Sequence, residues 1–251
     1  MTRSANLWGF GLAISLALLA MPVAAQTACR NLTFEDSPFT VCEARTDQDL
    51  RLFHADENGD VLGSFRRVND TLAPEGKTLV FAMNAGMYHS DRAPVGLLIT
   101  ESQERARIVT SDGPGNFGLL PNGVFCIRQG RFAVIESRLF AAKPPACRFA
   151  TQSGPMLVID GALHPRFLPD SDSRFIRNGV GVSADGQTAY FAISGQVVNF
   201  DTFGRLFRDV LGTPNALYFD GKVSRLFAPA LSRNDFGFQL GPMVGLVAPL
   251  P

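Results

Sequence analysis

Short apolar runs that end at glycine, proline, asparagine or aspartate recur along most of the chain. Runs of this kind are typical of β-strands joined by tight turns. We predict strands at 78–83, 96–100, 123–127, 132–136, 156–159, 180–183, 188–193 and 215–219. The turns at 128–131 and 184–187 join their flanking strands into hairpins, and the turn at 56–59 is predicted to do the same for residues 51–53 and 61–62.

Two segments have helical spacing instead. Ser64 is predicted to cap a short helix with Phe65, Val68 and Leu72 on one face.

The second helical segment has apolar residues at i, i+3, i+4 and i+7 from Phe203 to Val210. We expect Asp201 or Thr202 to cap its start and Gly212 to end it. Because this helix lies between the strands at 188–193 and 215–219, the unit is predicted to be a right-handed crossover that joins two parallel strands of one sheet.

The remaining strands read as hairpins, so the predicted fold class is α+β or mixed α/β, with one or two twisted mixed β-sheets and few helices in a single domain. The chain has 251 residues and is 46% hydrophobic, which is enough for one sizeable core. Its 24 glycines, 16 prolines and 21 phenylalanines also favour sheet over a helix bundle.

The formal net charge is zero, with 23 acidic and 23 basic side chains. No overall field attracts nucleic acid or an anionic membrane, so neither is a predicted partner. An anionic ligand must therefore be held by local groups.

The first residues predict export. Arg3 precedes an apolar stretch at 7–21, and small residues at 23–25 suit cleavage before Gln26. An uncleaved membrane anchor is the alternative, and lipidation at Cys29 is rejected because Gln26 stands where leucine is expected. We therefore predict a signal peptide at 1–25 and one domain at 26–251, in a periplasmic or secreted protein with no stable membrane anchor after cleavage.

The four cysteines are Cys29, Cys42, Cys126 and Cys147. An even count in an exported protein indicates disulfides, and four cysteines allow three pairings. Pairing 29 with 42 and 126 with 147 is favoured because each closes a short loop. No cofactor is predicted, and although a divalent metal is not excluded, no Cys/His spacing indicates one.

Polar residues beside glycines at strand ends are the candidates for function. Asn84 ends a buried strand, and Gly86 would let the backbone approach a ligand closely. Asn122 opens another strand beside a glycine. Ser153 and the amide of Gly154 could form an anion nest. Each of these patterns also occurs in ordinary turns.

Two further clusters carry charge. Arg177 and Asn178 lie at the mouth of a glycine-rich strand, where an arginine suits bidentate phosphate binding, the alternative being a surface salt bridge. Asp220 ends the second strand of the crossover, with Ser224 four residues later, at the kind of strand end where ligands bind. The alternative for Asp220 is an Asp-Gly turn. Together, one phosphate ligand and one carboxylate favour a site.

These clusters resemble the phosphodiester glycosidase family. The matching stretches are MNAGMY at 83–88, APVGLLI at 93–99, PNGVF at 121–125, TQSGPMLVIDG at 151–161, IRNGVGVSADG at 176–186, VNFDTFGRLFRDVLG at 198–212 and NALYFDGKVS at 215–224. The family includes the uncovering enzyme, an N-acetylglucosamine-1-phosphodiester α-N-acetylglucosaminidase, and a bacterial branch described as exopolysaccharide-related. The sequence departs from the animal pattern where a double glycine is expected after Asp220 and where threonine is common at Asn178, which leaves the substrate open.

The resemblance implies hydrolysis of a sugar-1-phosphodiester to free sugar and a phosphomonoester. On that basis we expect Asp220, Arg177 and Asn84 to be catalytic. Asp220 would act as base or nucleophile, and Arg177 would grip the phosphate. The expected substrate- or phosphate-binding residues are Ser153, Gly154, Asn178, Gly86, Asn122 and Ser224.

Two other functions stay open. The same cleft could serve a non-catalytic phosphoglycan-binding module in exopolysaccharide assembly. A phosphodiesterase could instead cleave the P–O bond, although such enzymes commonly use a metal pair and this chain has only three histidines.

Overall fold

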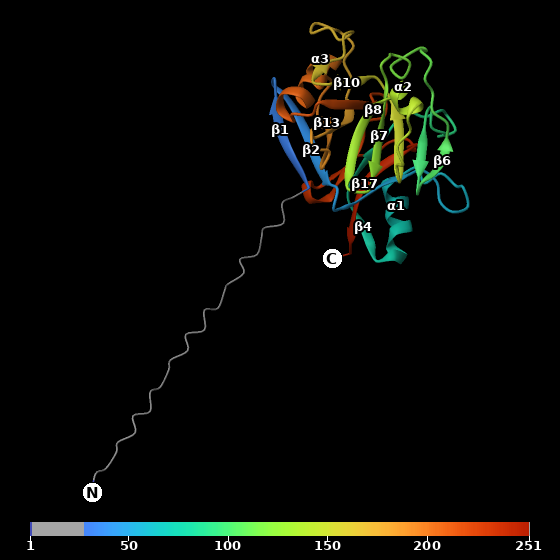
Figure 1. The fold of residues 1–251 in the computed structure, drawn as a ribbon, viewed down its shortest axis with the longest axis vertical. Helices are drawn as coiled ribbons and strands as arrows, with labels where there is room; N and C mark the ends of the chain where they lie inside the picture. Colours follow the sequence, from blue (N-terminus) through green and yellow to red (C-terminus); the bar gives the residue numbers. More distant parts are fainter. Residues whose placement is uncertain (2–27, 251) are drawn as a thin grey trace.

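A computed structural model of the chain describes residue 1 and residues 28–250 (Figure 1). The predicted signal peptide and its cleavage site fall at 2–27 and so lie outside the described residues. None of the helices in the described part is long and apolar enough to cross a membrane.

Three sheets make up the fold, and every strand pair within them is antiparallel. Sheet I has the order β1 (Cys29–Phe34), β2 (Ser37–Arg45), β13 (Thr188–Ser194), β12 (Asn178–Val182), β14 (Asn215–Asp220), β10 (Met156–Ile159) and β11 (Ala162–Leu163). Sheet II has the order β16 (Arg233–Asn234), β15 (Leu226–Ala228), β4 (Lys77–Asn84), β17 (Met243–Pro249) and β3 (Asp49–Phe53). Sheet III has the order β6 (Gln103–Ala106), β5 (Leu98–Thr100), β9 (Phe149–Ser153), β7 (Gly123–Arg128) and β8 (Arg131–Glu136).

The helices are few and short. They are α1 (Phe65–Leu72), α2 (Ser137–Ala142) and α3 (Phe200–Arg205), with 3₁₀ turns at Ala73–Glu75 and Pro229–Leu231 and a π-helical turn at Leu206–Val210. Strand accounts for 42% of the structure and helix for 14%, which confirms the predicted single-domain α+β class. The cap of α1 is also confirmed, because Ser64 Oγ accepts a hydrogen bond from the Arg67 N–H at 3.2 Å.

The cap predicted for the second helix was wrong. Asn199 begins α3, and its side chain accepts from the Thr202 N–H at 2.9 Å. Asp201 instead pairs with Arg205, one turn further on, at 2.8 Å. Asparagine caps as well as aspartate does, so the helix starts two residues earlier than the spacing of its apolar stripe suggested.

The parallel direction of the two crossover strands is confirmed, with one strand between them, and the right-handed connection stays a prediction. Strands β13 and β14 run parallel in sheet I, but β12 lies between them and is antiparallel to both. The end of β14 is therefore not flanked by parallel strands, and the strand-end rule used for Asp220 does not apply in the form assumed.

The hairpin predicted at 51–62 was wrong. Strand β3 pairs with β17 from the other end of the chain, and only the bridge between Ala55 and Val61 closes the turn. The strand β17 was not predicted, and it completes sheet II by lying between β3 and β4.

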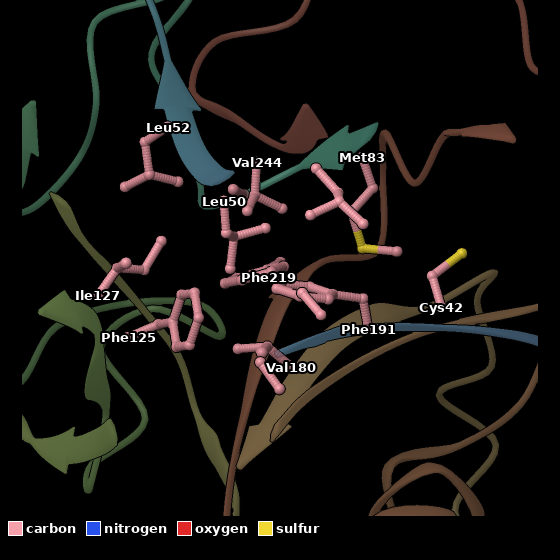
Figure 2. Packing of buried hydrophobic residues seen from close by; sticks show 14 of the residues in the cluster. Cys42, Leu50, Leu52, Met83, Phe125, Ile127, Val180, Phe191, Phe219 and Val244 are labelled. Atoms are coloured by element: carbon pink, nitrogen blue, oxygen red, sulfur yellow. The ribbon is translucent and has the colours of Figure 1, made fainter. Parts of the chain in front are cut away.

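The inner faces of all three sheets pack into one aromatic core. Figure 2 shows Met83 of β4, Phe125 of β7 and Phe219 of β14 pointing toward a common centre. The Phe191 ring lies 5.7 Å from the Phe125 ring in an edge-on contact. Each large side chain buried in this way contributes about 1.5–3 kcal/mol. The other face of sheet I packs on α3, where Phe39 stacks on Phe203 at 6.3 Å.

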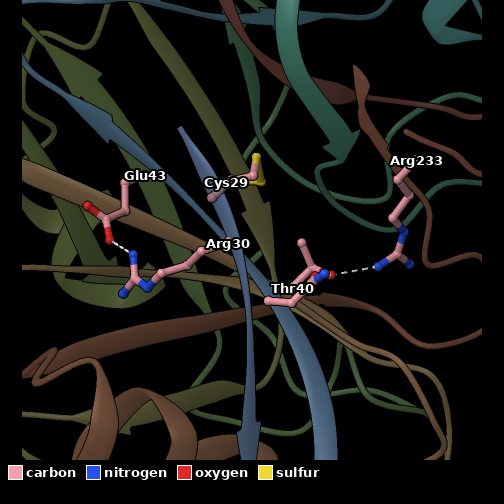
Figure 3. Close-up of a disulfide and its surroundings, with 7 residues drawn as sticks. Cys29, Arg30, Thr40, Glu43 and Arg233 are labelled. Carbon is pink, nitrogen blue, oxygen red and sulfur yellow. Dashed lines mark hydrogen bonds and ion pairs between the residues drawn. A yellow bond between two sulfur atoms is a disulfide. The ribbon is translucent and has the colours of Figure 1, made fainter. Parts of the chain in front are cut away.

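Both favoured disulfides are confirmed. Cys29–Cys42 joins β1 to β2, beside the ion pair between Arg30 and Glu43 (Figure 3). Cys126–Cys147 joins β7 to the segment that leads into β9. The second bond closes a loop of sequence separation 21 and lies in the apolar cluster of sheet III.

Removing that second disulfide should destabilise the protein. We expect the double variant Cys126→Ala, Cys147→Ala to lose about 3 kcal/mol in free energy of unfolding, because the open loop adds entropy to the unfolded chain. Urea unfolding under oxidising conditions measures this. An unchanged urea midpoint in the double variant would contradict the Cys126–Cys147 disulfide. As a control, the native protein is also unfolded in the presence of a reducing agent, which should lower its midpoint.

Candidate active site

Polar residues from all three sheets meet where their strands end. Asn84 ends β4, Ser153 ends β9 and Asp220 ends β14, while Asn178 begins β12. In an antiparallel pair one strand begins where its neighbour ends, and Asn178 accordingly stands opposite Asp220 in the register. We call these four residues the junction. The structure thus brings together residues that the sequence analysis selected from four separate segments.

The two asparagines of the junction bond to each other across sheets I and II. Asn178 Nδ2 donates to the Asn84 carbonyl at 2.8 Å and to Asn84 Oδ1 at 3.1 Å. Asn84 Oδ1 also accepts from the Arg225 N–H at 2.9 Å. Both side chains are fully buried. They position neighbouring backbone in this structure, and their contact with a substrate stays a prediction.

Asn178 also holds the loop that follows β14. Its Oδ1 accepts from the Asp220 N–H at 3.2 Å. The Ser224 hydroxyl lies 2.8 Å from the Asp220 carbonyl and 2.9 Å from the Ile176 carbonyl. The hydroxyl has one proton, so it donates to one of these two carbonyls at a time. Its bond to the Asp220 carbonyl closes the loop from 220 to 224.

Ser153 joins sheet III to sheet I, because its hydroxyl donates to the Phe219 carbonyl at 2.9 Å. Next to it, a Cβ on Gly154 would lie 2.6 Å from the Asn122 Cβ. Asn122 is buried and donates to the Phe117 carbonyl at 2.8 Å, while its Oδ1 has no partner in the described residues. These three residues lie together as expected.

Gly86 has a packing reason to be glycine. Its φ is +130°, and a Cβ there would lie 2.9 Å from Thr151 Oγ1. Sheet III fills the space beside it. A ligand approach at Gly86 stays a prediction.

Asp220 presents a carboxylate with one free oxygen. Its Oδ1 accepts from the backbone N–H groups of Gly221 at 2.6 Å and Lys222 at 2.9 Å. No hydrogen bond to Oδ2 is formed within the described chain, although the Val223 N–H also lies close enough to lower the pKa of the carboxyl. Burial raises the pKa of this carboxyl, and the N–H donors of the turn lower it by a smaller amount. The Asp-Gly turn is therefore real, and it fixes the carboxylate.

Arg177 is fully buried, so a surface salt bridge is the wrong reading of it. Its Nε donates to the Val198 carbonyl and its Nη2 to the Ser173 carbonyl, both at 2.8 Å. The guanidinium carbon lies 3.6 Å from the centroid of the Phe200 ring. Nη1 has no partner in the described residues, and burial lowers the pKa of the group. The Tyr218 hydroxyl lies near this guanidinium and partly offsets the effect of burial on its pKa. Contact of Arg177 with a phosphate stays a prediction.

The sequence analysis missed Tyr218, whose buried hydroxyl lies close to the side chains of Arg177 and Asn116. Burial raises the pKa of Tyr218, and these two side chains lower it by less. Its Oη lies 2.1 Å from the position of a Cβ on Gly221, so it stands against the Asp220 turn. Tyr218 lies only two residues before Asp220 in β14, and this nearness in the sequence is the signal that could have found it.

Two other features lie outside the junction. A groove of about 870 Å³ runs beside β3 and the turn at 56–59, and no junction residue lines it. Among the described residues, no cluster of three or more His, Cys, Asp or Glu side chains could hold a metal ion.

A family model matches most of the chain. Residues 77–237, more than half of the chain, match the sequence model of the phosphodiester glycosidase family. The chain is 31% identical over 222 residues to the "Uncharacterized protein YigE" of Escherichia coli (strain K12), covering 88% of this chain and 85% of that protein.

Two solved structures share the fold. The catalytic domain of zebrafish N-acetylglucosamine-1-phosphodiester alpha-N-acetylglucosaminidase, auto-inhibited by its pro-peptide, superposes with a TM-score of 0.58 at 12% identity, over 87% of this chain and 81% of that one. A putative exported protein of Burkholderia pseudomallei K96243 does so with a TM-score of 0.53 at 10% identity, over 84% of this chain and 74% of that one.

The contact between Gly221 and Tyr218 yields a test of the site geometry. Gly221→Ala should destabilise the protein by about 1–3 kcal/mol, because the added methyl group collides with a buried, immobile ring. Thermal unfolding measures the effect. Gly113→Ala is the matched control, since its new Cβ would have no neighbour closer than 4.0 Å. Equal melting temperatures for the two variants would show that Tyr218 does not stand against the turn.

Proposed function

The chain belongs to the phosphodiester glycosidase family, and we propose that it hydrolyses the glycosidic C–O bond of a sugar-1-phosphodiester to free sugar and a phosphomonoester. The observation that carries this proposal is the Asp220 carboxylate. Two backbone N–H groups hold one oxygen at the end of β14, and the other oxygen is left for chemistry.

The reaction suits a site with one prominent carboxylate. The bond between the anomeric carbon and the phosphate oxygen breaks, and its electron pair stays on the phosphate. Because this leaving group departs as a stabilised anion, it needs less help from an acid than an ordinary alcohol does. Oδ2 of Asp220 either takes a proton from the attacking water or attacks the anomeric carbon itself.

The groups around Asp220 support positioning and charge. The pair Asn84 and Asn178 fixes the backbone on both sides of the carboxylate, and Ser153 ties the preceding residue, Phe219, to sheet III. The Arg177 guanidinium, which lies over the rings of Phe200 and Tyr218, supplies positive charge. In this proposal, Gly154 and Asn122 form the surface next to Ser153 on which the substrate rests.

The place of action is also part of the proposal. Two disulfides are typical of proteins that fold in an oxidising compartment. We propose that the protein is exported by the N-terminal signal and acts on an envelope or extracellular glycan.

Replacement of the carboxylate is the direct test of catalysis. We expect Asp220→Asn to lower kcat/KM for a glycosyl phosphodiester about 10²- to 10⁴-fold. Asp185→Asn is the matched control, because Asp185 also accepts a backbone N–H in an Asp-Gly turn but lies far out in solvent. A binding module would instead show ligand binding without turnover, and binding would survive Asp220→Asn.

The raised pKa of Asp220 predicts the pH dependence. Because the ionised form is the active one, kcat/KM should fall on the acid side at a pH above the ordinary pKa of 3.8 for an aspartate.

The same pKa shift predicts how stability depends on pH. The folded protein holds the Asp220 proton more tightly than the unfolded chain, so the native protein loses stability as pH rises through the raised pKa. Asp220→Asn removes that loss, and its free energy of unfolding at neutral pH should equal or exceed the native value. A marked loss of stability would contradict this assignment.

The bond that breaks can be identified with labelled water. Hydrolysis in ¹⁸O-water should leave the phosphomonoester unlabelled, because C–O cleavage keeps the original oxygen on phosphorus. Mass spectrometry of that product is unaffected by exchange at the sugar's anomeric position. Label in the phosphomonoester would establish P–O cleavage and a phosphodiesterase instead.

A further inference from the structure

Arg225 is a buried arginine whose binding edge is empty. Its side chain lies just after Ser224 and the residue is 8% exposed. Both Nε and Nη2 are buried without a hydrogen-bond partner in the described part of the chain. These two nitrogens form one edge of the guanidinium, and their parallel N–H bonds fit two oxygens of a phosphate or carboxylate.

The same edge of Arg177 is already occupied. There, Nε and Nη2 donate to the carbonyls of Val198 and Ser173. Of the two buried arginines that border the junction, Arg225 is the one with the bidentate edge free. An unpaired buried guanidinium is costly, so such a group persists where it meets a ligand.

Other groups around Arg225 reinforce the positive charge. Arg92 Nε is also buried without a partner in the described residues, and its guanidinium lies 5.5 Å from the Tyr88 ring centroid. Burial and the charge of Asp220 raise the pKa of Tyr88, whereas Arg92 and Arg225 lower it, so all three charged groups lie near Tyr88. The neighbouring acid, Asp235, is held by Arg233 at 2.9 Å.

Arg225 also connects to the junction through its backbone. Its N–H donates to Asn84 Oδ1, and Asn84 bonds to Asn178, which in turn accepts from the Asp220 N–H. These bonds link the backbone at Arg225 to the backbone at Asp220.

The cover over the guanidinium is a weakly held segment. A Cβ on Gly237 would lie 3.4 Å from the Arg225 Cζ, so residues 236–238 pass directly over it. Within the described chain these three residues make no hydrogen bonds, and the flanking Phe236 and Phe238 are 89% and 83% exposed. Hydrogen bonds therefore do not hold this segment in place over the arginine.

We infer that the Nε–Nη2 edge of Arg225, supported by Arg92 and Tyr88, is the seat of the substrate's phosphate group. The inference rests on the proposed function for the identity of the ligand. It assigns bidentate phosphate binding to Arg225 in place of Arg177. For hydrolysis, the anomeric carbon of a sugar whose phosphate is bound on Arg225 must then reach the Asp220 carboxylate.

Binding of inorganic phosphate to the mature chain tests this assignment without turnover. We expect calorimetry to show phosphate binding by the native protein and about 10- to 100-fold weaker binding by Arg225→Lys, which cannot offer two parallel donors. Arg148→Lys is the matched control, since both oxygens of Glu101 already occupy that arginine's edge. Its affinity should equal the native value.

Arg225→Met separates a binding role from a structural one. Because the native guanidinium is buried and unpaired, we expect this variant to melt at an equal or higher temperature in phosphate-free buffer and to lose phosphate binding. A lower melting temperature with native affinity would overturn the inference. So would the absence of phosphate binding by the native protein, or its loss in Arg177→Lys with Arg225→Lys unaffected. If phosphate binds through Arg225 but no glycosyl phosphodiester is hydrolysed, the proposed function fails and the binding site stands.

Discussion

The bond pair between Asn84 and Asn178 is the contact on which the site depends. It crosses from sheet II to sheet I, where no backbone ladder connects them. From this pair, one bond reaches the backbone of Arg225 and another reaches that of Asp220. Both asparagines are fully buried, and buried amides of this kind are expensive to leave unpaired. The backbone positions of Asp220 and Arg225 are thereby tied to the same pair of side chains.

The electrostatics of the site follow from what each buried charge touches. Nε and Nη2 of Arg177 donate to two backbone carbonyls, and its guanidinium stacks on Phe200, so Arg177 stabilises the loop at 173–177 as well as supplying charge. Nε and Nη2 of Arg225 donate to no group in the described residues. Burial raises the pKa of Asp220, which ends β14. A buried cation without an anionic partner favours the binding of an anion.

Local sequence signals predicted most strands, the α1 cap and the pairing of the cysteines, because each depends on neighbours in the chain. The residues of the junction were also found, since asparagine, serine and aspartate beside glycine mark strand ends. What failed depends on partners far away. The pairing of β3 with β17 is set by the whole sheet. The cap of α3 was assigned to Asp201 or Thr202 because these residue types cap helices as well as Asn199 does. Arg225 and Tyr218 were missed because an open guanidinium edge and a buried hydroxyl are visible only once their neighbours are placed.

The central claim is that the strand ends around Asp220 form the site at which a sugar phosphate binds. A crystal structure of Asp220→Asn soaked with a glycosyl phosphodiester tests it most directly. The account predicts the phosphate on the Nε–Nη2 edge of Arg225 and the anomeric carbon facing the side chain at 220. Ligand found instead in the groove beside β3, with the junction unchanged, would contradict it.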